Sequence, residues 1–144
     1  MASRSGAAMA SDTCPDCHDL DLRLRQATEA READGPPVYI AAPYRGDGTI
    51  PIETNVTLAM AAFRALADLD IDAECPHVSF YLDPYNHRGD EWWLRHTMRK
   101  MLACTHVLRL GSVSSGADAE VARAHERKIP VFHSVKDLRQ ALGK

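Results

Sequence analysis

Residues 38–48, VYIAAPYRGDG, begin with five apolar residues and end in a glycine-rich turn. Pro36 and Pro37 come directly before them, so the apolar run stands between two breaks in regular structure. A short apolar run with turn residues on both sides is typical of a strand that is buried on both faces of a sheet. We therefore predict a strand over residues 38–42, with a loop at its carboxyl end.

After this strand, helical patterns alternate with short apolar runs. Apolar residues at helical spacing predict helices over residues 53–69, 90–103, 117–127 and 134–141. Thr54 or Asn55 can cap the first helix, and Ser134 can cap the last. Short strands fit residues 72–75, 106–110 and 129–132, and a long loop fits residues 77–89. The alternation predicts an α/β fold in a single domain: a flavodoxin-like (Rossmann-like), doubly wound parallel sheet of four to five strands.

The first part of the chain has a different character. Residues 1–19 are rich in Ser, Ala and Asp and show no periodicity, which is typical of a flexible tail. Residues 20–33 can form a short helix, although Leu20, Leu22 and Leu24 alternate instead of following a helical stripe. We therefore expect an N-terminal tail over residues 1–36 and one folded domain over residues 37–144.

Cys14 and Cys17 form a CxxC pair in this tail, and His18 follows directly. Three interpretations stay open. The pair can be incidental in a disordered segment, or it can supply part of a zinc site whose remaining ligands are not evident in the sequence. It can also be a redox or haem-attachment motif without the surroundings that such motifs require. For the functional site itself we expect neither a metal nor a cofactor.

Composition excludes several classes of protein. Hydrophobic residues make up 45% of the chain and charged residues 26%, which are ordinary values for a globular protein. Seventeen basic and twenty acidic residues give a net charge of −3, which does not favour a nucleic-acid polymer as partner. The apolar runs are too short for a membrane span or a secretory signal. Four cysteines are too few for a disulfide scaffold, so we expect a cytoplasmic protein with reduced thiols and no membrane partner.

The candidate site lies in the loops that follow the strands, because ligands of such sheets bind beyond the carboxyl ends of the strands. These loops are residues 43–52, 76–90 and 111–118. In the first loop, Arg45 can offer a planar fork to a phosphate or carboxylate, and a plain surface turn is the alternative. In the third loop, the free amides at a helix start suit an anion, and an ordinary helix cap is the alternative.

Glu120 is the sharpest single candidate, because it lies near the start of a predicted helix at the ligand-binding edge. A carboxylate there can attack an electrophilic carbon or stabilise a cation. The middle loop gathers polar and aromatic side chains that either form a lid or wall of the site or make surface contacts. They are His77, Tyr81, Asp83, Tyr85, His87 and Asp90.

Two stretches resemble the nucleoside 2-deoxyribosyltransferase-like superfamily. Residues 38–46, VYIAAPYRG, resemble its opening strand and loop. Residues 114–124, SSGADAEVARA, resemble its second signature, in which a glutamate opens a helix. Residues 75–77, CPH, and 80–84, FYLDP, look like an uncharacterised branch that is found in bacteria and their phages.

The resemblance implies an enzyme that cleaves the N-glycosidic bond of a deoxynucleoside or nucleotide, by hydrolysis or deoxyribosyl transfer. By position, Glu120 becomes the nucleophile, which agrees with the use of carboxylates by glycosidases. In the related 2′-deoxynucleoside 5′-monophosphate N-glycosidases, a loop arginine and a serine–glycine pair hold the 5′-phosphate, which favours hydrolysis of a nucleotide here. Together with the loops, this gives the expected substrate-binding residues Tyr44, Arg45, Gly46, His77, Ser114, Ser115, Gly116 and Asp118. The resemblance also implies a homodimer.

The sequence departs from the superfamily at Thr97, where members usually carry an aspartate. A threonine cannot act as a general acid at neutral pH, so protonation of the departing base loses its usual agent. We expect His96 or Asp83 to replace it as a catalytic residue, with Asp90 and Glu91 as further candidates. The alternative is a nucleotide-binding or sensing domain that has kept the pocket and lost efficient catalysis.

Overall fold

The computed structural model describes residues 15–34 and 37–144 of the chain. By their contacts, the residues form two compact units, Met1–Gly35 and Pro36–Lys144. The division between the units falls directly before the Pro36–Pro37 pair. Among the described residues, no helix combines the length and the apolar character that crossing a membrane requires.

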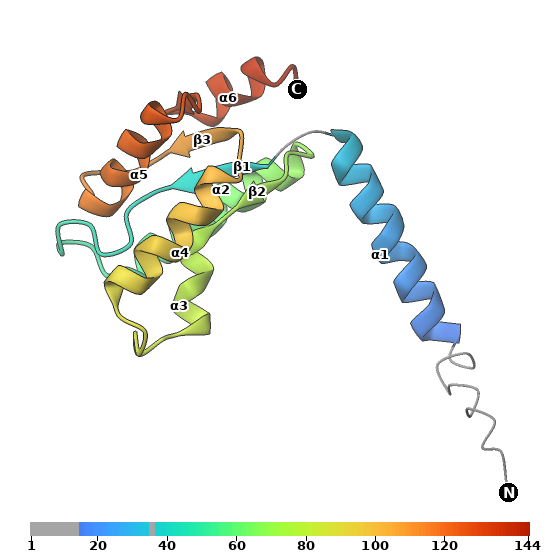
Figure 1. Cartoon of the computed structure of the whole chain (residues 1–144), viewed down its shortest axis with the longest axis horizontal. Helices are drawn as coiled ribbons and strands as arrows, with labels where there is room; N and C mark the ends of the chain where they lie inside the picture. Colours follow the sequence, from blue (N-terminus) through green and yellow to red (C-terminus); the bar gives the residue numbers. More distant parts are fainter. Residues whose placement is uncertain (1–14, 35–36) are drawn as a thin grey trace, which may run out of the picture. The chain divides into compact units, whose positions relative to one another are not determined.

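The described part of the first unit is one long helix, α1 (Pro15–Asp34) (Figure 1). It extends beyond the helix expected over residues 20–33 and includes residues 15–19, which the sequence assigned to the tail. Cys17 and His18 belong to this helix, whereas Cys14 lies outside the described residues.

The second unit contains a four-stranded sheet in which all neighbouring strands are parallel. The strands are β1 (Val38–Ala41), β2 (Ala73–Glu74), β3 (His106–Arg109) and β4 (Val131–Phe132). Their order is β2-β1-β3-β4, so the chain reverses its direction of travel across the sheet after β2 (Figure 1). In register, Val38 lies opposite both Ala73 and His106. This confirms the predicted flavodoxin-like strand order. The switch point, at which the strand order reverses and ligands of such sheets bind, lies between β1 and β3.

Five α-helices of this unit connect or follow the strands. They are α2 (Ile52–Asp68), α3 (Ser79–Leu82), α4 (Asp90–Leu102), α5 (Ser115–Glu126) and α6 (Val135–Ala141). Residues 77–89 are not one long loop, because the 3-10 helix η2 (Pro76–Val78) and then α3 occupy the first part. Helix α5 begins earlier than predicted, because Ser114 Oγ accepts a hydrogen bond from Ala117 N (3.3 Å) and caps it.

Of the predicted N-terminal caps of α2 and α6, the cap of α6 is confirmed and the cap of α2 is wrong. Ser134 caps α6, since its Oγ accepts a hydrogen bond from Asp137 N (3.1 Å). Neither Thr54 nor Asn55 caps α2, because this helix already begins after Pro51. The Asn55 amide instead donates to the backbone oxygen of Tyr44 (2.8 Å) and ties the loop after β1 to α2.

The core lies on both faces of β1, whose four residues are fully buried. Alternate side chains of a strand point to opposite faces, so the strand divides its residues between two clusters. On one face, β1 packs against α2 and α6 through Val38, Ile40, Leu66 and Leu138. On the other face, it packs against α4 and α5 through Tyr39, Ala41, Met101 and Ala124. The sheet is therefore covered by helices on both faces, as the sequence predicts (Figure 1).

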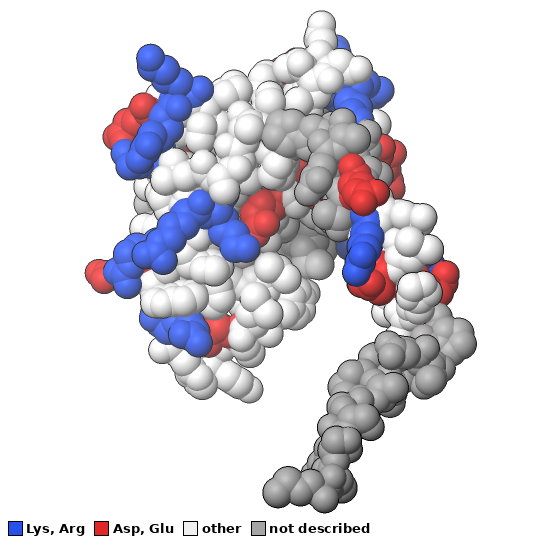
Figure 2. Space-filling model, turned by 45° about the vertical axis from the view of Figure 1, so that its right-hand side comes forward, with Lys and Arg blue, Asp and Glu red and all other residues white. Residues whose placement is uncertain are grey.

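Charged side chains of both signs share the surface. On the face shown in Figure 2, Lys and Arg side chains stand beside Asp and Glu side chains, with uncharged surface between them. This mixture agrees with a net charge of only −3.

The loops after β1 and β3 approach each other closely at Gly111. Its φ is +83°, in the left-handed region that favours glycine, and a Cβ placed on it would lie 2.7 Å from Pro43 Cδ. Gly48 has the same φ of +83° and open space around it. Both positions therefore require a residue that tolerates a positive φ. Gly111 must in addition lack a Cβ atom, because Pro43 leaves no space for one.

This pair provides a test of the loop packing. Gly111→Ala should lower the free energy of unfolding by about 3 kcal/mol, because backbone strain and a forced shift of Pro43 each contribute about 1–2 kcal/mol. Gly48→Ala should lower it by about 1 kcal/mol, from backbone strain alone. Urea unfolding followed by tryptophan fluorescence measures both. Equal losses in the two variants would show that the contact with Pro43 does not hold the loops.

Candidate active site

A cavity of about 340 Å³ lies where the loops after β1, β2 and β3 meet, at the carboxyl edge of the sheet. This is the position that a doubly wound sheet predicts for a ligand. Nine of the eleven expected catalytic and substrate-binding residues line it: Tyr44, Arg45, Gly46, His77, Asp83, Ser114, Ser115, Gly116 and Glu120. The further candidates Asp90 and Glu91 line it as well, and so does Thr97. The structure therefore brings all three candidate loops to one place.

Two of the expected site residues lie elsewhere. His96, on α4, stacks on Trp92 with ring centroids 5.1 Å apart and is not part of the cavity lining in the described structure. Asp118 is likewise outside the lining, because its carboxylate accepts a hydrogen bond from Arg109 Nη2 (3.1 Å). The same guanidinium reaches the backbone oxygens of Leu110 and Ser112, so Arg109 holds the loop between β3 and α5.

Glu120 is the centre of the site. Its side chain lies on α5 and the residue is only 7% exposed. The Tyr39 hydroxyl donates to Oε1 at 2.7 Å, and the Thr97 hydroxyl lies 3.3 Å from the same oxygen. No described residue donates a hydrogen bond to the second oxygen, Oε2, and Glu120 lines the cavity. One carboxylate oxygen is thus held in place while the other is available to a ligand.

Burial raises the pKa of Glu120 from 4.5 to about 6. The hydrogen bonds from Tyr39 and Thr97 and the positive charge of Arg109 act in the opposite direction, because they favour the ionised form. Burial also raises the pKa of Tyr39, and the nearby charge of Glu120 raises it further. At neutral pH the tyrosine therefore remains a donor, and most of the Glu120 side chains are ionised.

The raised pKa makes the stability of the chain depend on pH. Since the folded value of about 6 exceeds the ordinary 4.5, the folded state binds the proton more tightly than the unfolded state. This contribution to stability is complete below about pH 4.5 and is lost as the pH rises through about 6. The difference corresponds to about 2 kcal/mol.

Glu120→Gln cannot ionise at this position. We therefore expect its free energy of unfolding, relative to that of wild type, to rise by about 2 kcal/mol as the pH increases from about 4 to about 8. Denaturant unfolding at a series of pH values measures this. Glu126→Gln serves as the control, because it removes a carboxylate from an exposed position of the same helix, where Glu126 pairs with Arg123 (2.6 Å) outside the cavity. A constant difference between Glu120→Gln and wild type across the range would contradict the raised pKa.

The start of α5 offers hydrogen-bond donors to the cavity. The first N–H groups of a helix have no partner inside the helix, and Ser115 and Gly116 stand at these positions beside the cap Ser114. Arg45 approaches from the loop after β1, and its guanidinium already pairs with Asp90, with Nη2 and Oδ1 3.1 Å apart. Both side chains of this pair are largely exposed to solvent.

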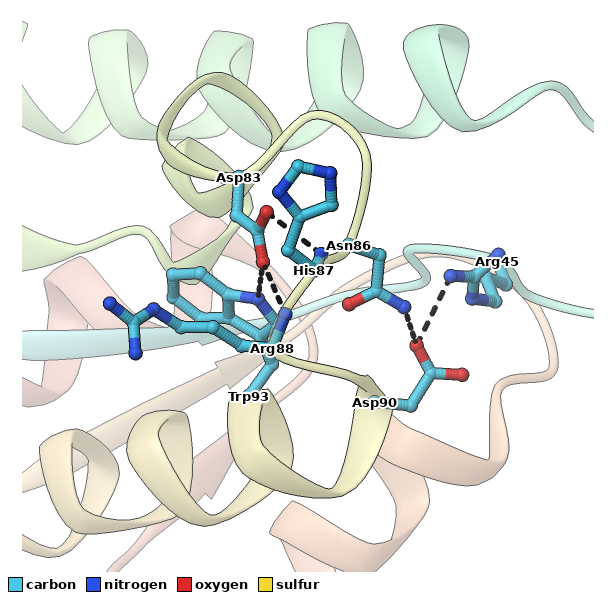
Figure 3. Close-up of polar contacts among 7 residues, drawn as sticks. All are labelled: Arg45, Asp83, Asn86, His87, Arg88, Asp90 and Trp93. Carbon is cyan, nitrogen blue, oxygen red and sulfur yellow. Dashed lines mark hydrogen bonds and ion pairs between the residues drawn. The ribbon is translucent and has the colours of Figure 1, made fainter.

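Asp83 organises the wall of the cavity that follows β2 (Figure 3). Its carboxylate accepts hydrogen bonds from the backbone N–H of His87 (2.9 Å) and Arg88 (3.1 Å) and from Trp93 Nε1 (3.0 Å). The bond from Trp93 contributes most to lowering the pKa of Asp83 below its ordinary value. The group is therefore an ionised acceptor at neutral pH. It stabilises a turn and carries no proton that it could transfer.

Asp90 receives two donors on one oxygen (Figure 3). Asn86 Nδ2 lies 2.6 Å from Oδ1, and Arg45 Nη2 lies 3.1 Å from it. Because Asn86 belongs to the turn that Asp83 holds, this wall is connected to the loop after β1. Asn86 and Trp93 both line the cavity, and Asn86 did not stand out in the sequence.

His77 joins the loops after β2 and β1. The residue is 3% exposed, and its Nε2 lies 2.8 Å from the backbone oxygen of Pro43. A carbonyl can only accept, so Nε2 carries a hydrogen. Burial lowers the pKa of His77, although the carbonyls of Pro43 and Ala42 oppose this. The ring is therefore neutral, and its buried Nδ1 has no partner among the described residues.

Tyr39 is the most important residue that the sequence pattern missed. The sequence pattern places it in an apolar strand, yet its hydroxyl makes the shortest hydrogen bond to Glu120. A buried tyrosine hydroxyl needs a polar partner, so a tyrosine in the central strand was a usable signal. Within residues 15–34 and 37–144, no group of three or more His, Cys, Asp or Glu side chains could hold a metal ion.

The family described as Domain of unknown function (DUF7768) matches residues 36–134. The chain belongs to this family. The DUF7768 region contains all four strands and every residue that lines the cavity, and it ends before α6. No curated protein and no solved structure matches the chain.

Proposed function

We propose that this DUF7768 protein cleaves the N-glycosidic bond of a nucleoside or nucleoside 5′-monophosphate, with Glu120 as the nucleophile. The observation that carries the proposal is the Glu120 carboxylate, which is buried, has Oε1 held by two hydroxyls and has Oε2 open to the cavity. The resemblance to nucleoside 2-deoxyribosyltransferase-like proteins supports the same assignment. It also implies a homodimer, which stays a prediction.

In the proposed reaction, Glu120 Oε2 attacks the anomeric carbon of the sugar as the bond to the base breaks. The base leaves with the electron pair of that bond and takes a proton from solvent. The transition state resembles an oxocarbenium ion, which a nearby carboxylate stabilises. The resulting glycosyl ester is then cleaved by water, or by another base in a transferase. Tyr39 and Thr97 position Oε1 throughout, so they orient the carboxylate without touching the sugar.

The start of α5 is the proposed site for the 5′ end of the substrate. The N–H groups of Ser115 and Gly116 suit the oxygens of a 5′-phosphate or a 5′-hydroxyl. Arg45 can contribute further N–H donors, since the pairing with Asp90 uses only Nη2. We favour hydrolysis over transfer because this arginine and serine–glycine arrangement resembles that of nucleotide hydrolases.

Chromatography of the purified protein with a panel of nucleosides and nucleoside monophosphates tests the proposal. We expect free base from at least one substrate, and a loss of about 10³-fold or more in kcat/KM for Glu120→Gln. Glu126→Gln on the same helix should retain full activity, and thermal unfolding should show that both variants are folded. Base release that survives in Glu120→Gln would rule out the nucleophile.

The pH profile gives an independent check. Because the nucleophile must be ionised, kcat/KM should fall as the pH drops through about 6. Tyr39→Phe removes a donor that favours the ionised form of Glu120, so the acid limb should move to higher pH. Thr97→Val should move it in the same direction. An acid limb that stays in place in both variants would mean that another group controls it.

One observation favours a second candidate, a domain that binds nucleotides without turnover. Thr97 cannot protonate a departing base, and Asp83 is held as an ionised acceptor. Under this alternative, a nucleotide raises the melting temperature of the wild type while no substrate releases base. The same panel of compounds therefore separates the two candidates.

A further inference from the structure

The cavity has an excess of negative charge. Among the described residues, four carboxylates line it, and Arg45 is the one lining side chain with a permanent positive charge. The carboxylates belong to Asp83, Asp90, Glu91 and Glu120. Arg45 is already paired with Asp90, so its charge does not offset the other three. Asp90 and Glu91 also lie in the first turn of α4, where the helix favours negative charge.

Three of the lining groups are poorly suited to protonate a departing base. A neutral base must gain a proton as it departs, and a positioned acid normally supplies it. Asp83 accepts three hydrogen bonds, and the Nε2 hydrogen of His77 is committed to Pro43 O. The Thr97 hydroxyl lies 3.2 Å from Leu94 O and 3.3 Å from Glu120 Oε1, and a hydroxyl of this kind does not ionise near neutral pH. None of these lining groups can protonate a leaving base.

Two further features of the lining suit a flat, positively charged ring. Trp93 and Tyr44 line the cavity, and aromatic rings attract cations through their electron-rich faces. The Trp93 ring is held by its bond to Asp83, so it is positioned before any ligand arrives.

We propose that the substrate is an N-glycoside whose heterocycle already carries a positive charge, such as a pyridinium riboside or an N7-alkylated purine nucleoside. This inference rests on the proposed function and names the substrate class of the same site. Both compounds share one chemistry, a cationic heterocycle whose positive charge is carried or shared by the ring nitrogen bonded to the anomeric carbon. The negative charge of the lining then stabilises the ring, and the heterocycle departs without needing a proton.

The bonds and charges balance without any acid. Glu120 Oε2 forms a bond to the anomeric carbon while the carbon–nitrogen bond breaks. The electron pair of the broken bond stays on the ring nitrogen and neutralises the charge of the heterocycle. The heterocycle leaves as a neutral molecule. Water then adds to the anomeric carbon, the ester bond breaks, and Glu120 returns as a carboxylate while one proton passes to solvent. The overall products are the free sugar, the neutral heterocycle and one proton.

Matched pairs of substrates test the charge requirement. Nicotinamide riboside is cationic, and dihydronicotinamide riboside is its neutral counterpart; 7-methylguanosine and guanosine form the purine pair. The full chain is assayed at about pH 6.5, where 7-methylguanosine is still largely cationic and Glu120, with a pKa of about 6, is mostly ionised. After correction for spontaneous release, kcat/KM for the cationic member should exceed that for the neutral member by about 10-fold or more. The pair that responds identifies the heterocycle.

Variants assign this preference to the cavity. In Asp90→Asn/Glu91→Gln, the ratio of cationic to neutral kcat/KM should fall by about 10-fold, because two of the carboxylates lose their charge. Asp68→Asn/Glu126→Gln removes the same charge from exposed positions of α2 and α5 and should leave the ratio unchanged. A merely structural effect of the cavity variant would lower both rates together and leave the ratio as in wild type.

The outcomes separate this inference from the proposed function. If the neutral member of each pair is cleaved as well as the cationic one, the inference is wrong and the proposed function stands. If no compound releases base, the proposed function is wrong, and equilibrium binding decides the inference. In that case 1-methylnicotinamide, a cation, should bind about 10-fold more tightly than neutral nicotinamide, and only the cavity variant should lose the difference. Equal binding of the two compounds would overturn the inference.

Discussion

The hydrogen bond from the Tyr39 hydroxyl to Glu120 Oε1 joins the centre of the fold to the cavity. Tyr39 is fully buried in β1, so its hydroxyl would lose hydrogen bonding to water without compensation if no partner were present. Glu120 is almost as deeply buried, and a buried carboxylate also requires donors. Each group meets the need of the other. The packing of α5 against the central strand therefore depends on the same contact that orients the carboxylate.

A second carboxylate has a different task. The turn after α3 contributes little to the hydrophobic core, so its backbone N–H groups need acceptors from elsewhere. Asp83 supplies them and also binds the Trp93 indole, which fixes the beginning of α4 relative to the turn. Asn86 and Asp90 extend this arrangement to Arg45 (Figure 3). The wall of the cavity is thus held mainly by hydrogen bonds, whereas the sheet beneath it is held by apolar packing.

This contrast explains which parts could be predicted from the sequence. Apolar packing leaves a periodic trace, so the apolar run at β1 and the strand order follow from the pattern of residues. Glu120 was found because the edge of a parallel sheet locates ligands in general. The turn organised by Asp83 leaves no periodic trace, since its partners depend on a conformation that only the coordinates show. His96 illustrates the limit: neighbouring helix positions differ by about 100°, so Thr97 reaches Glu120 while His96 stacks on Trp92.

Two opposite charge preferences meet in this cavity. The N–H groups at the start of α5 favour an anion, whereas the segment from Asp83 to Glu91 carries three carboxylates. Arg45 stands between these preferences because it pairs with Asp90 across an exposed contact, and such pairs contribute only about 0–1 kcal/mol. A 5′-phosphate can therefore draw Arg45 away from Asp90 at little cost, but it then leaves the Asp90 carboxylate without its partner. A ligand with an anionic sugar end and a cationic ring suits both the N–H groups of α5 and the carboxylates of this segment. A nucleotide with a neutral base suits only the N–H groups.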